Sequence, residues 1–130
     1  MIGIDTNVLV RYFLADDEIQ ARKARSFFAA LTADEPGFVS VVALVELVCV
    51  LERAANATDP EIVAALRFLL TCDALVVESE AEAFVAMTDL DEGRARFADA
   101  LIAALGQARG CSHTVTFNRK AARLPDFRLL

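Results

Sequence analysis

The chain has 130 residues, of which 56 % are hydrophobic and 25 % are charged, and its formal net charge is −6 at pH 7. This length and composition predict one globular domain over residues 1–130 and exclude a disordered chain. The apolar run Val41–Val45 ends at Glu46, and no uninterrupted apolar run approaches the roughly 20 residues of a membrane-spanning helix, so no membrane segment is predicted. No basic region precedes an apolar stretch at the N-terminus, so no signal peptide is predicted.

Helical and extended patterns alternate along the chain. In the first half we expect a strand over 1–5, helices over 7–14 and 17–32, a short strand over 38–39 and a helix over 41–55. In the second half the same patterns predict a helix over 60–71, a strand over 74–77, helices over 79–91 and 97–107, and a strand over 114–117. A loop or short helical turn over 118–123 and an edge strand over 127–130 follow. The predicted class is therefore α/β, with a central, mostly parallel sheet of four to five short strands flanked by helices.

Cysteine usage and charge narrow the class of protein. Cys49, Cys72 and Cys111 have no metal-ligand spacing, and we interpret Cys49 and Cys72 as buried thiols of a cytoplasmic protein. Residues 1–93 hold 6 Lys/Arg and 17 Asp/Glu, whereas residues 94–130 hold 7 Lys/Arg and 2 Asp/Glu. The acidic balance argues against nucleic-acid binding over the whole surface, but the basic C-terminal part can form a local anion-binding face or simply a solvated surface.

Four polar residues lie inside or at the end of apolar segments: Asp5, Glu46, Asp99 and Asn118. Asp5 and Asn118 each follow a predicted strand, so we expect both at the edge where open α/β sheets bind ligands. The structural alternatives are a helix-capping acid at Asp5 and an ordinary turn residue at Asn118. Asp99 falls in the first turn of an apolar helix, where the helix dipole also favours an acid.

Glu46 is the most informative of these residues. Every neighbour for five residues on either side is apolar, which predicts a helix that is buried nearly all round. A buried carboxylate must be paired, protonated or bound to a metal ion. An internal salt bridge is the alternative, although Arg53 lies two helical turns away.

Three carboxylates that meet in one cleft repel each other unless a cation neutralises them. Only one histidine, His113, is present, and there is no lysine cluster. A divalent cation resolves the repulsion, and a set of oxygen ligands favours Mg²⁺ or Mn²⁺ over zinc. Because such an ion activates water and stabilises charge on a phosphate, the predicted chemistry is hydrolysis of a phosphodiester.

The motifs together resemble the PIN domain, and more specifically the VapC-type ribonuclease toxins of bacterial type II toxin–antitoxin systems. The matching segments are Ile4–Asn7, Ser40–Leu47, Phe97–Ile102, Thr116–Lys120 and Leu124–Phe127. They occur in the family's order over essentially the whole chain. Each motif is weak singly, whereas the ordered set in a chain of 130 residues is specific.

The resemblance implies a Mg²⁺- or Mn²⁺-dependent endoribonuclease in which Asp5, Glu46 and Asp99 are the metal ligands. It implies an RNA substrate, often tRNA or another structured RNA, and a homodimer. It also implies a cognate VapB-like antitoxin whose C-terminal tail covers the cleft. No helix-turn-helix is recognised in this chain, so direct DNA binding is expected of the antitoxin instead.

Two positions depart from the family's pattern. Asn118 stands where an aspartate is usual, and we expect its amide to assist catalysis by holding a metal-bound water. This departure leaves the number of ions open. Arg96 stands where many relatives carry an acid, which removes a water-holding carboxylate and adds a candidate phosphate ligand.

The remaining site residues are expected to support ligands or to contact RNA. Thr6, Asn7 and Thr116 are expected to orient metal ligands and waters. The basic residues expected to contact RNA phosphates are Arg94, Arg96, Arg119 and Lys120. Sequence preference is expected to come from unpaired bases in an RNA loop.

Two other readings of the function stay open at this point. One is a PIN-like module that has lost catalysis and binds RNA or an antitoxin without cleavage, a reading that the two departures favour. The other is a phosphatase or phosphotransferase with an aspartate at the end of a strand. A haloacid-dehalogenase-type site needs an aspartate where Asn7 stands, and the chain has no Walker loop and no Gly-x-Gly-x-x-Gly motif.

Overall fold

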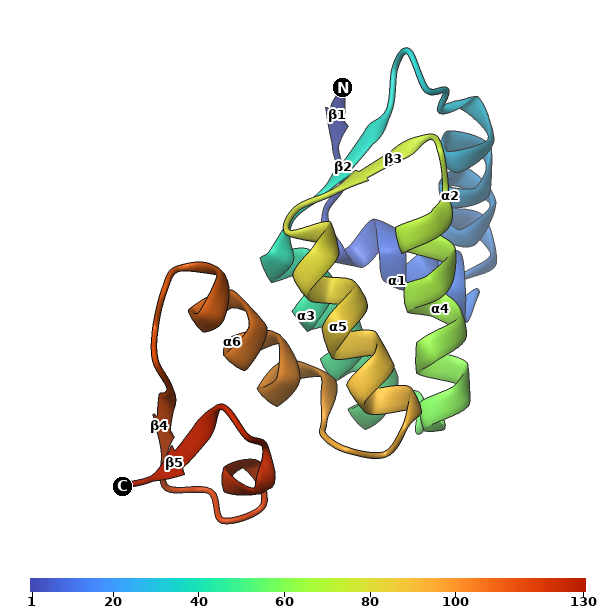
Figure 1. Cartoon of the computed structure of the whole chain (residues 1–130). Coiled ribbons are helices and arrows are strands. Elements are labelled where there is room, and N and C mark those ends of the chain that lie inside the picture. Colours follow the sequence, from blue (N-terminus) through green and yellow to red (C-terminus); the bar gives the residue numbers. More distant parts are fainter. The chain divides into compact units, whose positions relative to one another are not determined.

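The computed structural model describes residues 1–130, and the chain forms two compact units, Met1–Glu78 and Ser79–Leu130. Figure 1 labels their helices and strands. None of the helices has the length and apolar character needed to cross a membrane.

The first unit is a three-stranded sheet with four helices. Its elements are β1 (Ile2–Gly3), α1 (Thr6–Leu14), α2 (Glu18–Ala30), β2 (Gly37–Val39), α3 (Val41–Arg53), α4 (Asp59–Thr71) and β3 (Leu75–Val77). The strand order is β1-β2-β3 with both pairs parallel, and Gly37 lies opposite Ile2 on one side and Leu75 on the other. Parallel pairing needs crossover connections, and the helices between the strands supply them.

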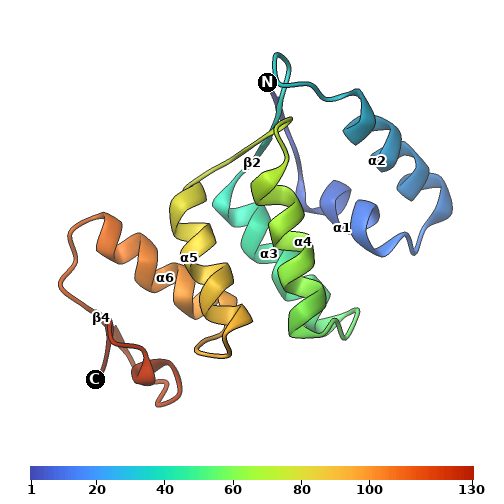
Figure 2. The ribbon, with the colours of Figure 1, turned by 45° about the vertical axis from the view of Figure 1, so that its right-hand side comes forward.

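Side chains from all parts of the first unit form its core. The largest fully buried ones are Leu9, Val39, Leu44, Leu47, Ile62, Leu66 and Leu69. Helices α3 and α4 contact each other and lie side by side in Figure 2. Aromatic rings tie α1 to its neighbours, since the Tyr12 ring lies 4.3 Å from that of Phe28 on α2 and 5.5 Å from that of Phe68 on α4.

Gly37 of β2 occupies a position without room for a side chain. A Cβ atom there would lie 2.6 Å from the Ile4 Cδ1 atom and 2.9 Å from the Leu75 Cδ2 atom. The absence of a side chain lets the apolar side chains of the neighbouring strands close over the middle of the sheet. Ile4 is accordingly buried at the end of β1, directly before Asp5.

The second unit contains two helices and a two-stranded sheet. Its elements are α5 (Glu80–Asp91), α6 (Phe97–Ala108), β4 (Thr114–Thr116), the 3₁₀ helix η1 (Ala121–Arg123) and β5 (Phe127–Leu129). Strands β4 and β5 are parallel, with Val115 opposite Arg128. Phe127 packs with Ala103, Ala121 and Leu124 in a small buried cluster.

The α/β class and the parallel strand pairing are confirmed, but the prediction of one central sheet is wrong. The five strands divide into sheets of three and two strands. Asp5 follows β1 of the first sheet and Asn118 follows β4 of the second, so each of them follows a parallel strand, as predicted. Local patterns identify a strand, whereas the partner of each strand edge is a tertiary property.

Helix caps account for most of the element boundaries. Ser40 accepts a hydrogen bond from the backbone N–H of Ala43 and begins α3. Helix α4 begins at Asp59, with Thr58 as its N-cap in a reciprocal capping box with Glu61. Hydrogen bonds that the Thr58 side chain and backbone make to this carboxylate hold the pKa of Glu61 below its usual value.

The three cysteines are free, as expected, but the burial expected of two of them is only partial. Cys49 and Cys72 are half-buried, and Cys111 is exposed. The apolar neighbours of Cys49 and Cys72 in the sequence therefore predicted more burial than these side chains have.

Candidate metal-binding site

Asp5 and Glu46 are linked through Thr6 in the first unit. The Oδ1 atom of Asp5 accepts a hydrogen bond of 2.9 Å from the backbone N–H of Thr6. The hydroxyl of the same threonine donates a hydrogen bond of 2.6 Å to the Oε2 atom of Glu46. One residue at the start of α1 therefore contacts both acids, although Glu46 lies 40 residues further along the chain.

Asp5 owes its position to its role as the N-cap of α1. Its backbone is extended, with φ −78° and ψ 153°, and its carbonyl oxygen accepts hydrogen bonds from the N–H groups of Val8 and Leu9. The capping alternative therefore describes part of what Asp5 does. Capping uses only one carboxylate oxygen, Oδ1, so the second oxygen stays available for another ligand.

Glu46 is exposed, and the prediction that its helix is buried nearly all round is wrong. Helix α3 buries one face, made up of Ala43, Leu44, Leu47, Val48 and Leu51. The other face carries Glu46 and also Val42, which is 67 % exposed. An apolar sequence around an acid therefore does not establish burial, because the neighbouring elements decide which face of the helix is covered.

These two carboxylates have the chemistry of ligands for a hard cation. Neither acid forms an ion pair, and each has one oxygen outside its bond to Thr6. Neither unit by itself brings together three histidine, cysteine or acidic side chains that could hold a metal ion. Mg²⁺ is often bound through only one or two carboxylates, with waters and substrate phosphates completing its coordination. The pair in the first unit fits that mode of binding.

Glu78 is a supporting acid that the sequence analysis missed. It follows β3, and its Oε2 atom accepts a hydrogen bond of 2.8 Å from the backbone N–H of Val41, the first residue of α3. Glu78 thus helps to fix the start of the helix that carries Glu46. Its position directly after an apolar strand is the signal that could have identified it.

Asp99 and Asn118 belong to the second unit. Asp99 lies in the first turn of α6, as predicted, and the structure shows that it is half-buried. The Oδ1 atom of Asn118 accepts a hydrogen bond of 2.9 Å from the backbone N–H of Lys120, and the hydroxyl oxygen of Thr116 accepts one of 3.0 Å from that of Asn118. Asn118 and Thr116 thereby shape the turn after β4, and their roles toward a metal ion stay predictions.

The predicted RNA-binding arginines and lysine differ in their surroundings. Arg94 donates a 2.8 Å hydrogen bond to Asp89 and also pairs with Glu92, so acids at the end of α5 hold its guanidinium group. Arg96 is exposed at the N-cap position of α6. Arg119 and Lys120 are exposed and form no ion pair, which leaves their charges available to an anion.

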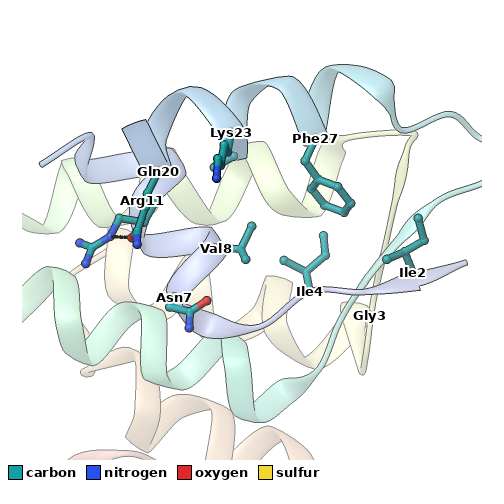
Figure 3. A pocket seen from close by; sticks show the side chains of 10 residues that line it. Ile2, Gly3, Ile4, Asn7, Val8, Arg11, Gln20, Lys23 and Phe27 are labelled. Atoms are coloured by element: carbon teal, nitrogen blue, oxygen red, sulfur yellow. Dashed lines mark hydrogen bonds between the residues drawn. The ribbon is translucent and has the colours of Figure 1, made fainter. Parts of the chain in front are cut away.

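A pocket of about 550 Å³ lies elsewhere in the first unit, beside β1, α1 and α2. Ile4, Val8 and Phe27 line its apolar part in Figure 3, and Arg11 at its border donates a hydrogen bond to Gln20. Asn7 lines this pocket, whereas Asp5 and Glu46 do not. No sequence pattern indicated the pocket, because its lining residues occupy ordinary positions of a strand and two amphipathic helices.

Replacing Thr6 by valine is expected to weaken Mn²⁺ binding about 10- to 100-fold, because groups that orient metal ligands contribute factors of this size. Valine keeps the shape of the side chain but removes the hydroxyl that holds Glu46. Isothermal titration with Mn²⁺ measures the change, and Thr6→Ser, which keeps the hydroxyl, is the matched control. Equal affinities of the valine and serine variants would show that the Thr6–Glu46 bond does not position a metal ligand.

Comparison with known protein families identifies the fold. The family model of the PIN domain matches residues 2–126, which is nearly the whole chain and includes all of the predicted metal ligands. A comparison with curated proteins found no match. PIN domains are generally metal-dependent nucleases, and this agrees with the two carboxylates of the first unit, neither of which forms an ion pair. With this match and this α/β architecture, the chain belongs to the PIN domain family.

Proposed function

We propose that the protein is a metal-dependent endoribonuclease that acts as the toxin of a type II toxin–antitoxin pair of the VapC type. The observation that carries the proposal is the contact of Asp5 and Glu46 with Thr6. Two acids from distant family motifs are held by one residue, and no basic side chain neutralises either of them. The proposed cation is Mg²⁺ or Mn²⁺, and the proposed ligands are these two acids together with Asp99, which its motif assigns to the same role.

The bound ion would lower the pKa of the attacking water and stabilise charge on the scissile phosphate. The chain's own residues prepare for that chemistry. Thr6 fixes the carboxylate of Glu46, and the N-cap geometry of Asp5 fixes the other carboxylate before any ligand binds. Arg119 and Lys120 are proposed to contact RNA phosphates, because their charges are exposed and unpaired.

The substrate and partners follow from the resemblance to VapC-type toxins. We propose a structured RNA such as tRNA as the substrate. A VapB-like antitoxin, whose C-terminal tail covers the carboxylates, and a second copy of the chain in a homodimer are the proposed protein partners. The cytoplasm, where RNA and antitoxin are both present, is the proposed location.

A second candidate function is binding of RNA or of an antitoxin without cleavage. The observation that favours it is the side chain of Asn118, which brings no charge and whose Oδ1 atom already accepts from the N–H of Lys120. A module of this kind would keep its RNA-binding cations and would lack a competent metal site.

A cleavage assay decides between the two functions. Purified protein is incubated with total tRNA and a panel of structured and single-stranded RNAs in Mg²⁺, in Mn²⁺ and in EDTA. The proposed function predicts discrete cleavage products that require the metal ion. RNA that is bound but uncut under every metal condition would support the binding module and contradict the proposed enzyme.

A further inference from the structure

The two-stranded sheet of the second unit has one packed face and one uncovered face. Side chains alternate along a strand, so Phe127 packs inward while the neighbouring Arg128 points to the opposite side. Arg128 lies across from Val115, which is 55 % exposed. Phe117, the residue that follows β4, is 81 % exposed.

Exposure of this kind is unusual for a phenylalanine side chain. Burial of a phenylalanine normally stabilises a fold, and Phe117 contributes little of that stabilisation to its own unit. The rings of Tyr12, Phe13, Phe27, Phe28 and Phe68 all pack against other rings in the first unit, whereas Phe117 has no aromatic contact. A flat apolar ring that faces solvent is suited to stacking against a ligand with its own ring.

Basic residues that form no ion pair flank Phe117 in the sequence. Residues 109–130 contain five basic side chains and one acid, Asp126, in a protein whose net charge is −6. The five are Arg109, Arg119, Lys120, Arg123 and Arg128, and none of them forms an ion pair. The charge of this segment is therefore available to an external anion rather than being used inside the unit.

We propose that Phe117, Arg119, Lys120 and Arg128 form a binding surface for an unpaired nucleotide of RNA, with the base stacked on the Phe117 ring. The three cations contact the phosphates on either side of that base. Exposed aromatic rings combined with basic side chains are the usual means by which proteins hold single-stranded RNA. This inference rests on the proposed function only in taking RNA as the ligand.

The position of the ring gives the surface a role in choosing the cleavage site. Phe117 directly precedes Asn118, which is one of the predicted catalytic residues, and Thr116 on its other side shapes the same turn. A base stacked on Phe117 would therefore lie near Asn118, a predicted catalytic residue of the same unit. Phe117 is thus a specificity-determining residue that selects an unpaired nucleotide near the scissile bond.

Binding of a fluorescent single-stranded RNA 12-mer to the full-length protein in EDTA tests the surface without cleavage. Phe117→Ala is expected to weaken binding about 10-fold, as loss of one base–aromatic stack does. Phe117→Leu should weaken it similarly, because leucine is apolar but cannot stack, and Phe117→Trp should retain the parent affinity. Ile102→Ala, which removes an apolar side chain that is 52 % exposed on α6, is the control and should leave binding unchanged.

Salt dependence tests the cations independently of the ring. Alanine at Arg119, Lys120 or Arg128 should reduce the slope of log Kd against log salt by about 0.7 each, the value for one phosphate contact on a single strand. An unchanged slope in all three variants would overturn the assignment of the cations. Thermal unfolding of the Phe117 variants reports whether the ring contributes to stability, and their sedimentation reports the oligomeric state.

Several results would overturn the inference. If Phe117→Leu binds RNA like the parent, the ring does not stack on a base. If Phe117→Ala lowers the midpoint of thermal unfolding by several degrees, the ring packs within the protein instead of facing a ligand. A changed oligomeric state in sedimentation would make this face a contact between copies of the chain. If the parent cleaves RNA, and Phe117→Ala and Phe117→Leu bind RNA as tightly as the parent does, only this inference fails. If the parent neither binds nor cleaves any RNA, the proposed function fails as well.

Discussion

Replacing Asp5 by asparagine should reduce metal-dependent RNA cleavage at least about 100-fold while leaving the fold intact, because a metal ion contributes several kcal/mol to the transition state. Asparagine is as good an N-cap as aspartate, and its amide oxygen can accept the hydrogen bond that Oδ1 accepts from the N–H of Thr6. The substitution therefore removes the charge offered to the cation and keeps the start of α1. Initial cleavage rates in saturating Mg²⁺, together with far-UV circular dichroism, measure the two effects.

The chain offers a matched control at the next helix. Asp17 is the N-cap of α2, and its Oδ1 atom accepts a hydrogen bond of 2.9 Å from the backbone N–H of Gln20. Asp17→Asn makes the same chemical change at the same kind of position, and cleavage should stay within about twofold of the parent, as for a surface substitution. Parent-like cleavage by Asp5→Asn would rule out this carboxylate as a metal ligand.

Asp99 extends the same experiment to the second unit. If Asp99 serves the same ion as Asp5, Asp99→Ala abolishes cleavage, and the double variant is no worse than either single variant. Residues that act as one catalytic unit show this lack of additivity. Multiplicative losses in the double variant would mean that the two acids contribute through separate steps or separate ions.

Replacing Phe97 by alanine should destabilise the protein by about 3–5 kcal/mol, the usual loss for a fully buried phenylalanine. Phe97 is 0 % exposed at the first position of α6, two residues before Asp99. This loss is a large part of the roughly 5–15 kcal/mol by which a domain is stable. The chain has no tryptophan, so urea unfolding is best followed by the far-UV circular dichroism of its helices.

Ile102 provides the comparison on the same helix. It is 52 % exposed, and Ile102→Ala should change the free energy of unfolding by only about 0.5 kcal/mol, as exposed positions usually do. Comparable losses at the two positions would contradict the burial pattern of α6. If the urea concentration at the midpoint of unfolding were nearly the same for Phe97→Ala and for the parent, the Phe97 ring would not be packed in the core.

Sequence patterns predicted the elements because their causes are local. The alternation of strands and helices, the Ser40 cap and the position of Asp99 in a first helical turn all depend on residues a few places apart. Helix α4 begins at Asp59, one residue before the predicted start, because the Thr58 hydroxyl caps the helix and Glu61 completes the capping box. A shift of this size is normal, since neighbouring polar residues compete for the cap.

Sequence patterns also identified which acids are unusual, but they could not describe their surroundings. Glu46 stands out in an apolar helix, yet it is exposed because the packed face of α3 is the one that carries Leu44 and Leu47. Apolar residues occur on both faces, as the exposed Val42 shows, so the neighbouring elements decide which face is covered. The same limit explains the cysteines, whose apolar neighbours in sequence predicted more burial than the structure has.

The sequence by itself therefore determined the α/β class, the order of the elements and the identity of the candidate ligands, because these depend on side-chain type and short-range spacing. Only the tertiary structure decided that the hydroxyl of Thr6 bonds to Glu46, that Glu78 caps α3, and that the strands form two sheets. Each of these features joins residues that are far apart in the chain. Their contact depends on how helices and strands pack, which no local pattern encodes.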